Sequence, residues 1–452
     1  MHVLASILGF ILAIGLLVAV HEWGHFWVAR RLGVKVLRFS IGFGRPLKTW
    51  RRGETEYVIA SLPLGGYVKM LDGREGPVEP DEVHRAFDRQ SVGKRAAIVA
   101  AGPVANLVFA VIAYALMYML GITGLAPILD APAAGTPAAQ AGLRGEAEVL
   151  AVNGHPVRTF DALRIAVLDA ATGGQPIQLR VREQGGERMV ELPGASYGLL
   201  KGTEDPLARL GLRPWEPRGN IIVRQVEEGA AAALAGLRVN DVVTGVGGMP
   251  VSRASELVEV IRQHPGERVE LDILRDGQSL RVSMILGMRR FNSEMVGYAG
   301  AAFSVDISDE TWARLRVVER LGVLEAVQAG LSRTWDMSVL TLRFMGKMLT
   351  GQASLETISG PLGIADVAGK SLVLGLSNFL AFLALVSLSL AILNLLPVPV
   401  LDGGHLLFYL IEALLGRPLS NEAQMFAQRI GMSLLLALMA LALFNDLTRL
   451  FF

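Results

Sequence analysis

The 452-residue sequence contains no cysteine, which excludes disulfide bonds, thiolate metal ligands and a cysteine nucleophile. Charged residues are scarce as well, because Asp, Glu, Lys and Arg make up only 19% of the chain. The formal net charge is +1, so the composition gives no reason to expect a nucleic-acid partner. Hydrophobic residues make up 52%, which is too apolar for an ordinary soluble protein of this length. The sequence therefore predicts a membrane protein.

Four apolar segments are long enough to cross a bilayer as helices, which predicts a polytopic α-helical membrane protein with four transmembrane helices. We place these helices at residues 1–28, 96–120, 372–401 and 425–452. The first segment lacks a basic start and a small-residue cleavage site, so we expect it to stay in the mature protein. Lys and Arg crowd the loop 29–95 and are absent before the first helix. This asymmetry predicts that this loop and the loop 402–424 lie in the cytoplasm and that both termini lie outside, which for a protein of the bacterial inner membrane means the periplasm.

The region between the second and third helices contains an internal repeat. "AGLRGEAEVLAVNGHPV" (141–157) matches "AGLRVNDVVTGVGGMPV" (235–251) at a constant offset of 94 residues, although Ala147 stands where the second copy has Asp241. Two copies of one domain follow from this match. Alternating apolar residues and glycine-rich turns predict β-rich periplasmic domains at 121–218 and 219–306, followed by amphipathic or linker helices at 307–371.

The repeated pattern is similar to that of bacterial PDZ domains in a circularly permuted order. This likeness implies that exposed peptide C-termini could bind near the loop formed by Leu210, Gly211 and Leu212.

The stretch "HEWGH" (21–25) ends the first apolar segment. In a helix, His21 and His25 project from one face and can bind one metal ion, while Glu22 lies beside them and can take a proton from water. This is the H-E-x-x-H arrangement of zinc hydrolases, so we predict a Zn²⁺ cofactor. The alternative is that these residues only mark the membrane interface, where tryptophans such as Trp23 are common. A charged group within a spanning helix costs about 2.5–3.5 kcal/mol, which favours the functional reading.

A third zinc ligand must come from elsewhere in the chain, and the best candidate is Asp402 in "LNLLPVPVLDGGHLLF". His21 lies about 30 Å along the first helix, and the third helix also runs inward to end at Asp402, so the two residues lie at similar depth. The alternative for Asp402 is an ordinary turn before two glycines. His405 is a further candidate, for which a supporting or structural role is favoured.

Together these motifs and "ISGPLGIADVAG" (358–369) resemble the site-2 protease family of intramembrane zinc proteases over nearly the whole chain. The resemblance implies zinc bound by His21, His25 and Asp402, with Glu22 as general base and Asn394 helping to hold the substrate backbone. It also implies cleavage of the transmembrane segment of a single-pass protein, such as an anti-sigma factor, after a first periplasmic cut in an envelope stress response.

Cleavage within lipid needs a water-accessible cavity, and non-helical backbone at that depth must line it. The segment "LPLGGYVKM" (62–70) could supply an edge strand there, since the family has a small membrane-associated β-sheet that could pair with an unwound substrate. The alternative is a surface hairpin in the cytoplasmic loop. We add as candidate substrate-binding residues Gly65, Gly66, Pro397 and Pro399.

Two function classes remain from the sequence. The first is a zinc endopeptidase within the membrane, and the second is a membrane-anchored PDZ binding module without proteolytic activity. The complete set of His21, Glu22, His25 and Asp402 favours the protease. Asn106 in the second helix is open to two interpretations, a hydrogen bond near the site or capping of the break made by Pro103.

Overall fold

The computed structural model describes residues 2–451 apart from 195–198, 200–204 and 292–293. The chain divides into two compact units, which are described separately. One comprises Met1–Ile122 and Glu319–Asp446 and is called the helical unit. The other comprises Thr123–Val318 and Leu447–Phe452 and is called the β unit.

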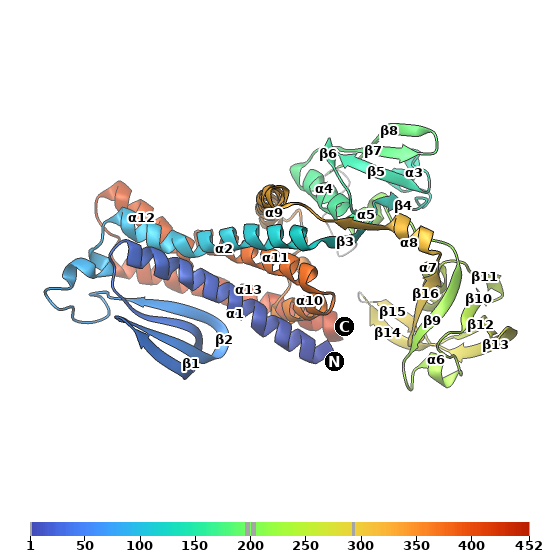
Figure 1. Ribbon diagram of the computed structural model, residues 1–452, viewed down its shortest axis with the longest axis horizontal. Coiled ribbons are helices and arrows are strands. Elements are labelled where there is room, and N and C mark those ends of the chain that lie inside the picture. The colour runs from blue at the N-terminus through green and yellow to red at the C-terminus, as the bar shows by residue number, and fades with distance from the viewer. Residues whose placement is uncertain (1, 195–198, 200–204, 292–293, 452) are drawn as a thin grey trace. The chain divides into compact units, whose positions relative to one another are not determined.

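Four helices in the described part of the chain are long and apolar enough to cross a membrane, which confirms the prediction of a membrane protein with four such helices. They are α1 (His2–Arg31), α2 (Val92–Leu120), α11 (Leu376–Leu395) and α13 (Asn421–Phe451). Helix α2 packs against both α1 and α11, as Figure 1 shows. Many of their large apolar side chains are exposed, which is expected of helices whose outer faces contact lipid.

The third spanning helix is shorter than the sequence predicts. Helix α11 ends at Leu395, because Pro397 and Pro399 cannot continue a helix, and the chain then runs without helix to Leu401. A separate helix, α10 (Pro361–Val373), precedes α11. The predicted loop after residue 401 instead contains α12 (Asp402–Leu415), whose apolar residues recur at helical spacing.

A buried carboxylate joins the start of α10 to α13. Asp446 in α13 is 2% exposed and accepts hydrogen bonds from the backbone N–H groups of Gly360, Leu362 and Gly363 at 2.9–3.0 Å. These N–H groups have no partner within α10, because they start the helix. The carboxylate therefore accepts hydrogen bonds from these donors, and its negative charge also interacts favourably with the positive end of the helix dipole. Asp446 thus fixes the "SGPLG" start of α10 to α13.

A two-stranded antiparallel sheet follows α1. Strand β1 (Val36–Arg52) pairs with two separate parts of β2 (Thr55–Met70). Ser40, for example, pairs with Val58 on one side and with Tyr67 on the other. Residues 36–41 are therefore central, and residues 66–70 of β2 form an outer edge. Phe26 of α1 packs its ring against Phe39 and Tyr57, which seats the sheet on the helix. The predicted strand at 62–70 lies within β2.

Helix α9 (Val323–Leu349) completes the helical unit and packs against α2. Gly330 permits this approach, because a Cβ there would lie 2.7 Å from the carbonyl oxygen of Val111. The β unit is connected to this unit through the paired strands β3 (Ile122–Leu125) and β17 (Arg316–Glu319).

The β unit has two separate hydrophobic cores, one for each copy of the repeat. The first copy has a sheet with strand order β4-β5-β7-β8, and β6 pairs with β5. Its elements are β4 (Ile128–Leu129), α3 (Pro137–Gln140), β5 (Ala147–Val152), β6 (His155–Pro156), α4 (Phe160–Gly173), β7 (Ile177–Glu183), β8 (Gly186–Leu192) and α5 (Pro206–Leu210).

The second copy has the strand order β13-β12-β10-β9-β16, and β11 pairs with β10. Its helix α7 (Ala254–Gln263) begins 94 residues after α4, so the repeat in the sequence is a repeat in structure. The remaining elements are β9 (Asn220–Val226), α6 (Ala231–Leu234), β10 (Val242–Val246), β11 (Met249–Pro250), β12 (Arg268–Arg275), β13 (Gln278–Ile285), β14 (Gly287–Phe291), β15 (Glu294–Tyr298), β16 (Ala301–Asp306) and α8 (Asp309–Leu315).

Candidate metal centre

Helices α1 and α12 bring the three predicted zinc ligands together. The Nε2 atoms of His21 and His25 are 3.2 Å apart, and Oδ2 of Asp402 lies 3.2 Å from the first and 3.6 Å from the second. Within the described residues, these three side chains form a group whose ligand atoms all lie within 4.8 Å of one another. His405, one turn further along α12, is not part of the group.

The three side chains fit a zinc ion. Zinc bonds to nitrogen and oxygen at about 2.0–2.2 Å in tetrahedral sites, which places the ligand atoms roughly 3.3 Å from one another. The separations of 3.2, 3.2 and 3.6 Å match this geometry. Oδ2 of Asp402 is buried and accepts no hydrogen bond from any described residue. A buried carboxylate oxygen without a donor is expected where a cation is the intended partner.

The other ring nitrogen of each histidine is held by α2. Nδ1 of His25 lies 2.8 Å from the carbonyl oxygen of Ile98, so Nδ1 carries the proton and Nε2 keeps its lone pair for a metal. The amide of Asn106 lies 3.3 Å from Nδ1 of His21. Asn106 is fully buried, and its Oδ1 has no partner among the described residues.

The amide orientation of Asn106 follows from this geometry. A half-turn of the amide exchanges its oxygen and nitrogen. Oδ1 then accepts the Nδ1–H of His21, which gives the oxygen its missing partner and leaves Nε2 of His21 free for zinc. Ser387 of α11 donates to the backbone oxygen of Asn106 at 2.8 Å and ties this position to the third spanning helix. Of the two interpretations left open by the sequence, the hydrogen bond near the site agrees with the structure.

Gly102 makes room for both imidazoles. A Cβ at this position would lie 2.2 Å from Nε2 of His25 and 2.8 Å from Cε1 of His21. Only glycine therefore lets α2 approach the histidine face of α1 this closely. Gly102 and the carbonyl of Ile98 are site groups that were not predicted from the sequence. The one available signal was a glycine directly before Pro103 within an apolar helix, which marks close packing or a functional backbone position.

The position of Asp402 depends on a tightly folded loop. Between Leu396 and Leu401 the backbone doubles back over the start of α12, with hydrogen bonds from Val398 N–H to Leu396 and from Leu401 N–H to Val398. A Cβ on Gly403 would lie 2.2 Å from the carbonyl oxygen of Leu396, so this return needs glycine directly after Asp402. A Cβ on Gly404 would come similarly close to the backbone of this loop.

Backbone strain accompanies this loop. Val400 has a φ of 150°, which is unfavourable for a β-branched residue. Such strain persists only where the surrounding packing enforces it, and it is found at functional sites more often than elsewhere.

The remaining predicted residues lie in different settings. Gly66 of β2 lies against Glu22, because a Cβ there would be 3.0 Å from Cγ of Glu22. Gly65, with a φ of 148°, packs on the ring of Phe43. Asn394 is half-buried at the end of α11. Pro397 is exposed and Pro399 half-buried in the loop before Asp402.

The predicted peptide-binding loop lies in the first β core. The side chains of Leu210 and Leu212 are at most 1% exposed. The N–H groups of Gly211 and Leu212 donate to Ala208 and Leu207, so this loop already uses these donors. Peptide binding near this loop stays a prediction, and the peptide would have to bind to other hydrogen-bond donors.

The arrangement can support hydrolysis of a peptide bond. His21, His25 and Asp402 would hold the zinc ion, which would supply Lewis-acid polarisation of the scissile carbonyl and a lower pKa for water. Glu22, one residue after the first ligand, can accept the proton of the attacking water and pass it to the leaving nitrogen. The carbonyl of Ile98 and the amide of Asn106 hold the imidazoles in the required tautomer throughout.

The comparison with known proteins agrees with this chemistry. The profile of peptidase family M50 matches residues 9–438. The regulator of sigma-E protease RseP of Escherichia coli strain K12 is 43% identical over 447 residues, which cover 98% of each chain. The regulator of sigma E protease of Salmonella typhi is 41% identical over 455 residues and 100% of each chain. A protein of Ralstonia nicotianae named as a putative zinc metalloprotease is 42% identical over 465 residues and 99% of each chain.

The chain belongs to peptidase family M50, the site-2 protease family. It is a zinc-dependent metalloprotease embedded in a membrane, as the resemblance in the sequence predicted. The alternative of a binding module without proteolytic activity is not favoured.

Proposed function

We propose that this protease cuts the transmembrane segment of single-pass proteins of the bacterial inner membrane, such as an anti-sigma factor, after a first cut outside the membrane. The observation that carries the proposal is the position of the histidine ligands, which lie in α1 and have their second ring nitrogens beside α2, two helices that are long and apolar enough to span a bilayer. In this proposal His21, His25 and Asp402 hold the zinc ion and Glu22 is the general base.

The edge of β2 is the proposed substrate-binding surface. Residues 66–70 pair with β1 on one side only, so their other edge has backbone groups available to another strand. Gly66 lies beside Glu22, and a substrate strand added at this edge would therefore pass the proposed general base. A transmembrane helix must unwind before its peptide bond can be attacked, and strand pairing satisfies the backbone groups that unwinding exposes. Asn394 and the loop with Pro397 and Pro399 would hold the substrate from the other side.

The charges support a proposed orientation in the membrane. Arg30, Arg31 and the basic residues of β1 flank the end of α1 near the zinc ligands, which supports a cytoplasmic position for this end and a periplasmic position for both termini and the β unit. The two β domains would then act as PDZ-like modules on the periplasmic side. They can influence cleavage in two ways, by excluding substrates with bulky outer domains or by delivering substrates through an exposed C-terminus.

A comparison of two substrates tests the function and separates these two roles. A single-pass anti-sigma-like protein would be supplied with its outer domain intact and already trimmed, to the full chain and to a variant lacking residues 126–305. We expect the full chain to cut only the trimmed form and the deletion variant to cut both. Slower cleavage of the trimmed form by the deletion variant, with the intact form still uncut, would instead identify the domains as delivery modules. No cleavage of either form by the full chain would contradict the proposed substrate class.

A further inference from the structure

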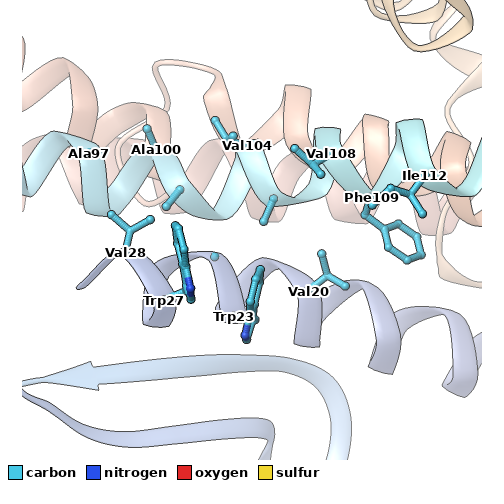
Figure 2. Close-up of a pocket in the computed structure, with 13 residues that line it drawn as sticks. Val20, Trp23, Trp27, Val28, Ala97, Ala100, Val104, Val108, Phe109 and Ile112 are labelled. Carbon is cyan, nitrogen blue, oxygen red and sulfur yellow. The ribbon is translucent and has the colours of Figure 1, made fainter. Parts of the chain in front are cut away.

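An apolar groove of about 560 Å³ lies between α1 and α2. Trp23 and Trp27 form one wall, and Ala97, Ala100, Val104 and Val108 form the other, as Figure 2 shows. The tryptophans follow His21 and His25 by two residues, which in a helix places them on the opposite side of α1 from the zinc ligands. The groove is therefore a separate feature from the metal centre.

The sequence explains why the groove exists. The rings of Trp23 and Trp27 stack at 6.1 Å with an interplanar angle of 28°, and each side chain is about half exposed. The side chains of α2 that face these rings are mostly small, so they leave space between the two helices unfilled. The two helices come closest at Gly24, where a Cβ would lie 2.3 Å from the carbonyl oxygen of Ala101. This close contact closes the floor of the groove and leaves its outer side open to lipid.

The groove is too narrow for another helix. Its lining on α2 extends from Ala97 to Ile112, about 22 Å at a rise of 1.5 Å per residue. Counting all the space between the atoms, about 1120 Å³, the mean cross-section over that length is roughly 50 Å², whereas a helix about 10 Å wide needs roughly 80 Å². An extended hydrocarbon chain is the apolar membrane component that fits within such a width.

Positive charge lies at one end of the groove. Arg31 continues the tryptophan stripe by one turn, and its guanidinium lies 5.0 Å over the ring of Trp27. No carboxylate among the described residues pairs with Arg31. Lys94 continues the opposite stripe of α2, one turn before Ala97, and is exposed. Because α1 and α2 are antiparallel and Val28 and Ala97 line the same groove, both cations stand at the same end.

We propose that this groove is a binding site for one anionic glycerophospholipid, with an acyl chain between the tryptophan pair and the small side chains of α2 and the phosphate beside Arg31 and Lys94. The apolar walls supply affinity for the chain, and the two cations supply selectivity for a negatively charged head group. The bound chain also fills the open side of the contact between α1 and α2, the two helices that hold the histidines and their partners.

Native mass spectrometry of the full-length protein tests the proposal with two probes, palmitoyl-oleoyl phosphatidylglycerol and palmitoyl-oleoyl phosphatidylcholine, which differ only in the head group. We expect one phosphatidylglycerol molecule to be retained in preference to phosphatidylcholine, by about fivefold for each basic residue. The double variant Arg31→Gln/Lys94→Gln should lose this preference, and the exchange Arg31→Lys/Lys94→Arg should keep most of it. The matched control is Arg51→Gln/Arg52→Gln, which removes two exposed charges of β1 and should leave the preference unchanged.

A separate variant tests whether an acyl chain occupies the groove. Val104→Phe fills the groove at an exposed position and should reduce retention of both lipids, whereas Leu436→Phe on the exposed face of α13 should not. If Arg51→Gln/Arg52→Gln lowers the preference as much as Arg31→Gln/Lys94→Gln does, the selectivity is general surface charge and the proposal is wrong. Unchanged retention in Val104→Phe would equally overturn it.

Discussion

Gly102 of α2 faces His25 of α1 so closely that a Cβ would lie 2.2 Å from Nε2 of the imidazole. The neighbouring Cε1 of His21 would be 2.8 Å away, so one methyl group displaces both histidines from the metal centre. We expect Gly102→Ala to weaken zinc binding by about 10–100-fold, as loss of the groups that orient metal ligands commonly does. Zinc content by elemental analysis and cleavage of a membrane substrate measure the effect.

The control for this substitution lies on the same helix. A Cβ on Gly93 would have no atom within 4 Å, so Gly93→Ala should leave both zinc and activity unchanged. Normal zinc content in Gly102→Ala would show that the contact relaxes without moving the ligands, which contradicts the prediction.

The second prediction concerns Glu22. If it transfers protons and does not hold the metal, Glu22→Gln should retain zinc and lose activity by about 10²–10⁴-fold. Zinc content and turnover must be measured on the same preparation. Loss of zinc together with activity would mean that Glu22 supports the metal site, and full activity would exclude it as the base.

The third prediction concerns the ligand supplied by α12. Asp402→Asn should lower zinc affinity and abolish cleavage, because a neutral amide oxygen is a poorer zinc ligand than a carboxylate. His405→Ala is the matched control one turn along the same helix, and it should retain zinc because His405 lies outside the ligand group. The reverse result, with zinc lost in His405→Ala and kept in Asp402→Asn, would show that the third ligand is His405.

The fourth prediction concerns the stability of the second β core. Burial alone would raise the pKa of Asp241, but hydrogen bonds from Arg275 and from the N–H of Arg238 outweigh burial and hold that pKa below its usual range. A carboxyl group whose pKa is lower in the folded state stabilises the fold above its unfolded pKa of about 3.9. This stabilisation is lost as pH falls through the folded pKa.

Hydrogen exchange of the β10 and β12 amides tests this dependence. Asp241→Asn should reduce protection at pH 7 by about 2 kcal/mol, since it leaves a partly buried guanidinium without its charge partner. The variant should also lose less protection than the wild type when the pH is lowered from about 5 to about 2. Asp272→Asn removes a more exposed ion pair with Arg281 and should cost less than about 1 kcal/mol. Equal effects of the two substitutions would contradict the role of Asp241.

The sequence predicts features that depend on local periodicity and short motifs. The apolar runs predicted the four long helices, and the spacing of His21 and His25 predicted one shared face of α1. Depth along the two helices led to Asp402, although nearly the whole chain lies between these residues. The end of α11 was placed too late, because apolar composition continues to Leu401 whereas the two prolines stop the helix at Leu395.

Contacts between distant segments could not be read from the sequence. The carbonyl of Ile98 is a backbone group that every residue has, and only the packing of α2 on α1 directs it at His25. The same limit applies to the repeat, where Ala147 replaces Asp241. In the first copy Glu183 accepts the N–H of Arg144, and Arg188 donates to Gly142 as Arg275 donates to Gly236. Each copy therefore has an ion pair between an arginine and a carboxylate, but the paired residues occupy different positions in the two copies. Alignment of the two copies does not reveal this.

The distance along the chain between the two halves of the metal centre has a consequence for biosynthesis. While the ribosome is still translating residues before Asp402, the nascent chain has only the two histidines and cannot complete the zinc site. The start of α10 is secured later still, when Asp446 emerges near the C-terminus. If Asp402 is the third ligand, the helices that enter the membrane early are therefore in place before the zinc site is complete, and proteolysis cannot begin until Asp402 has been translated.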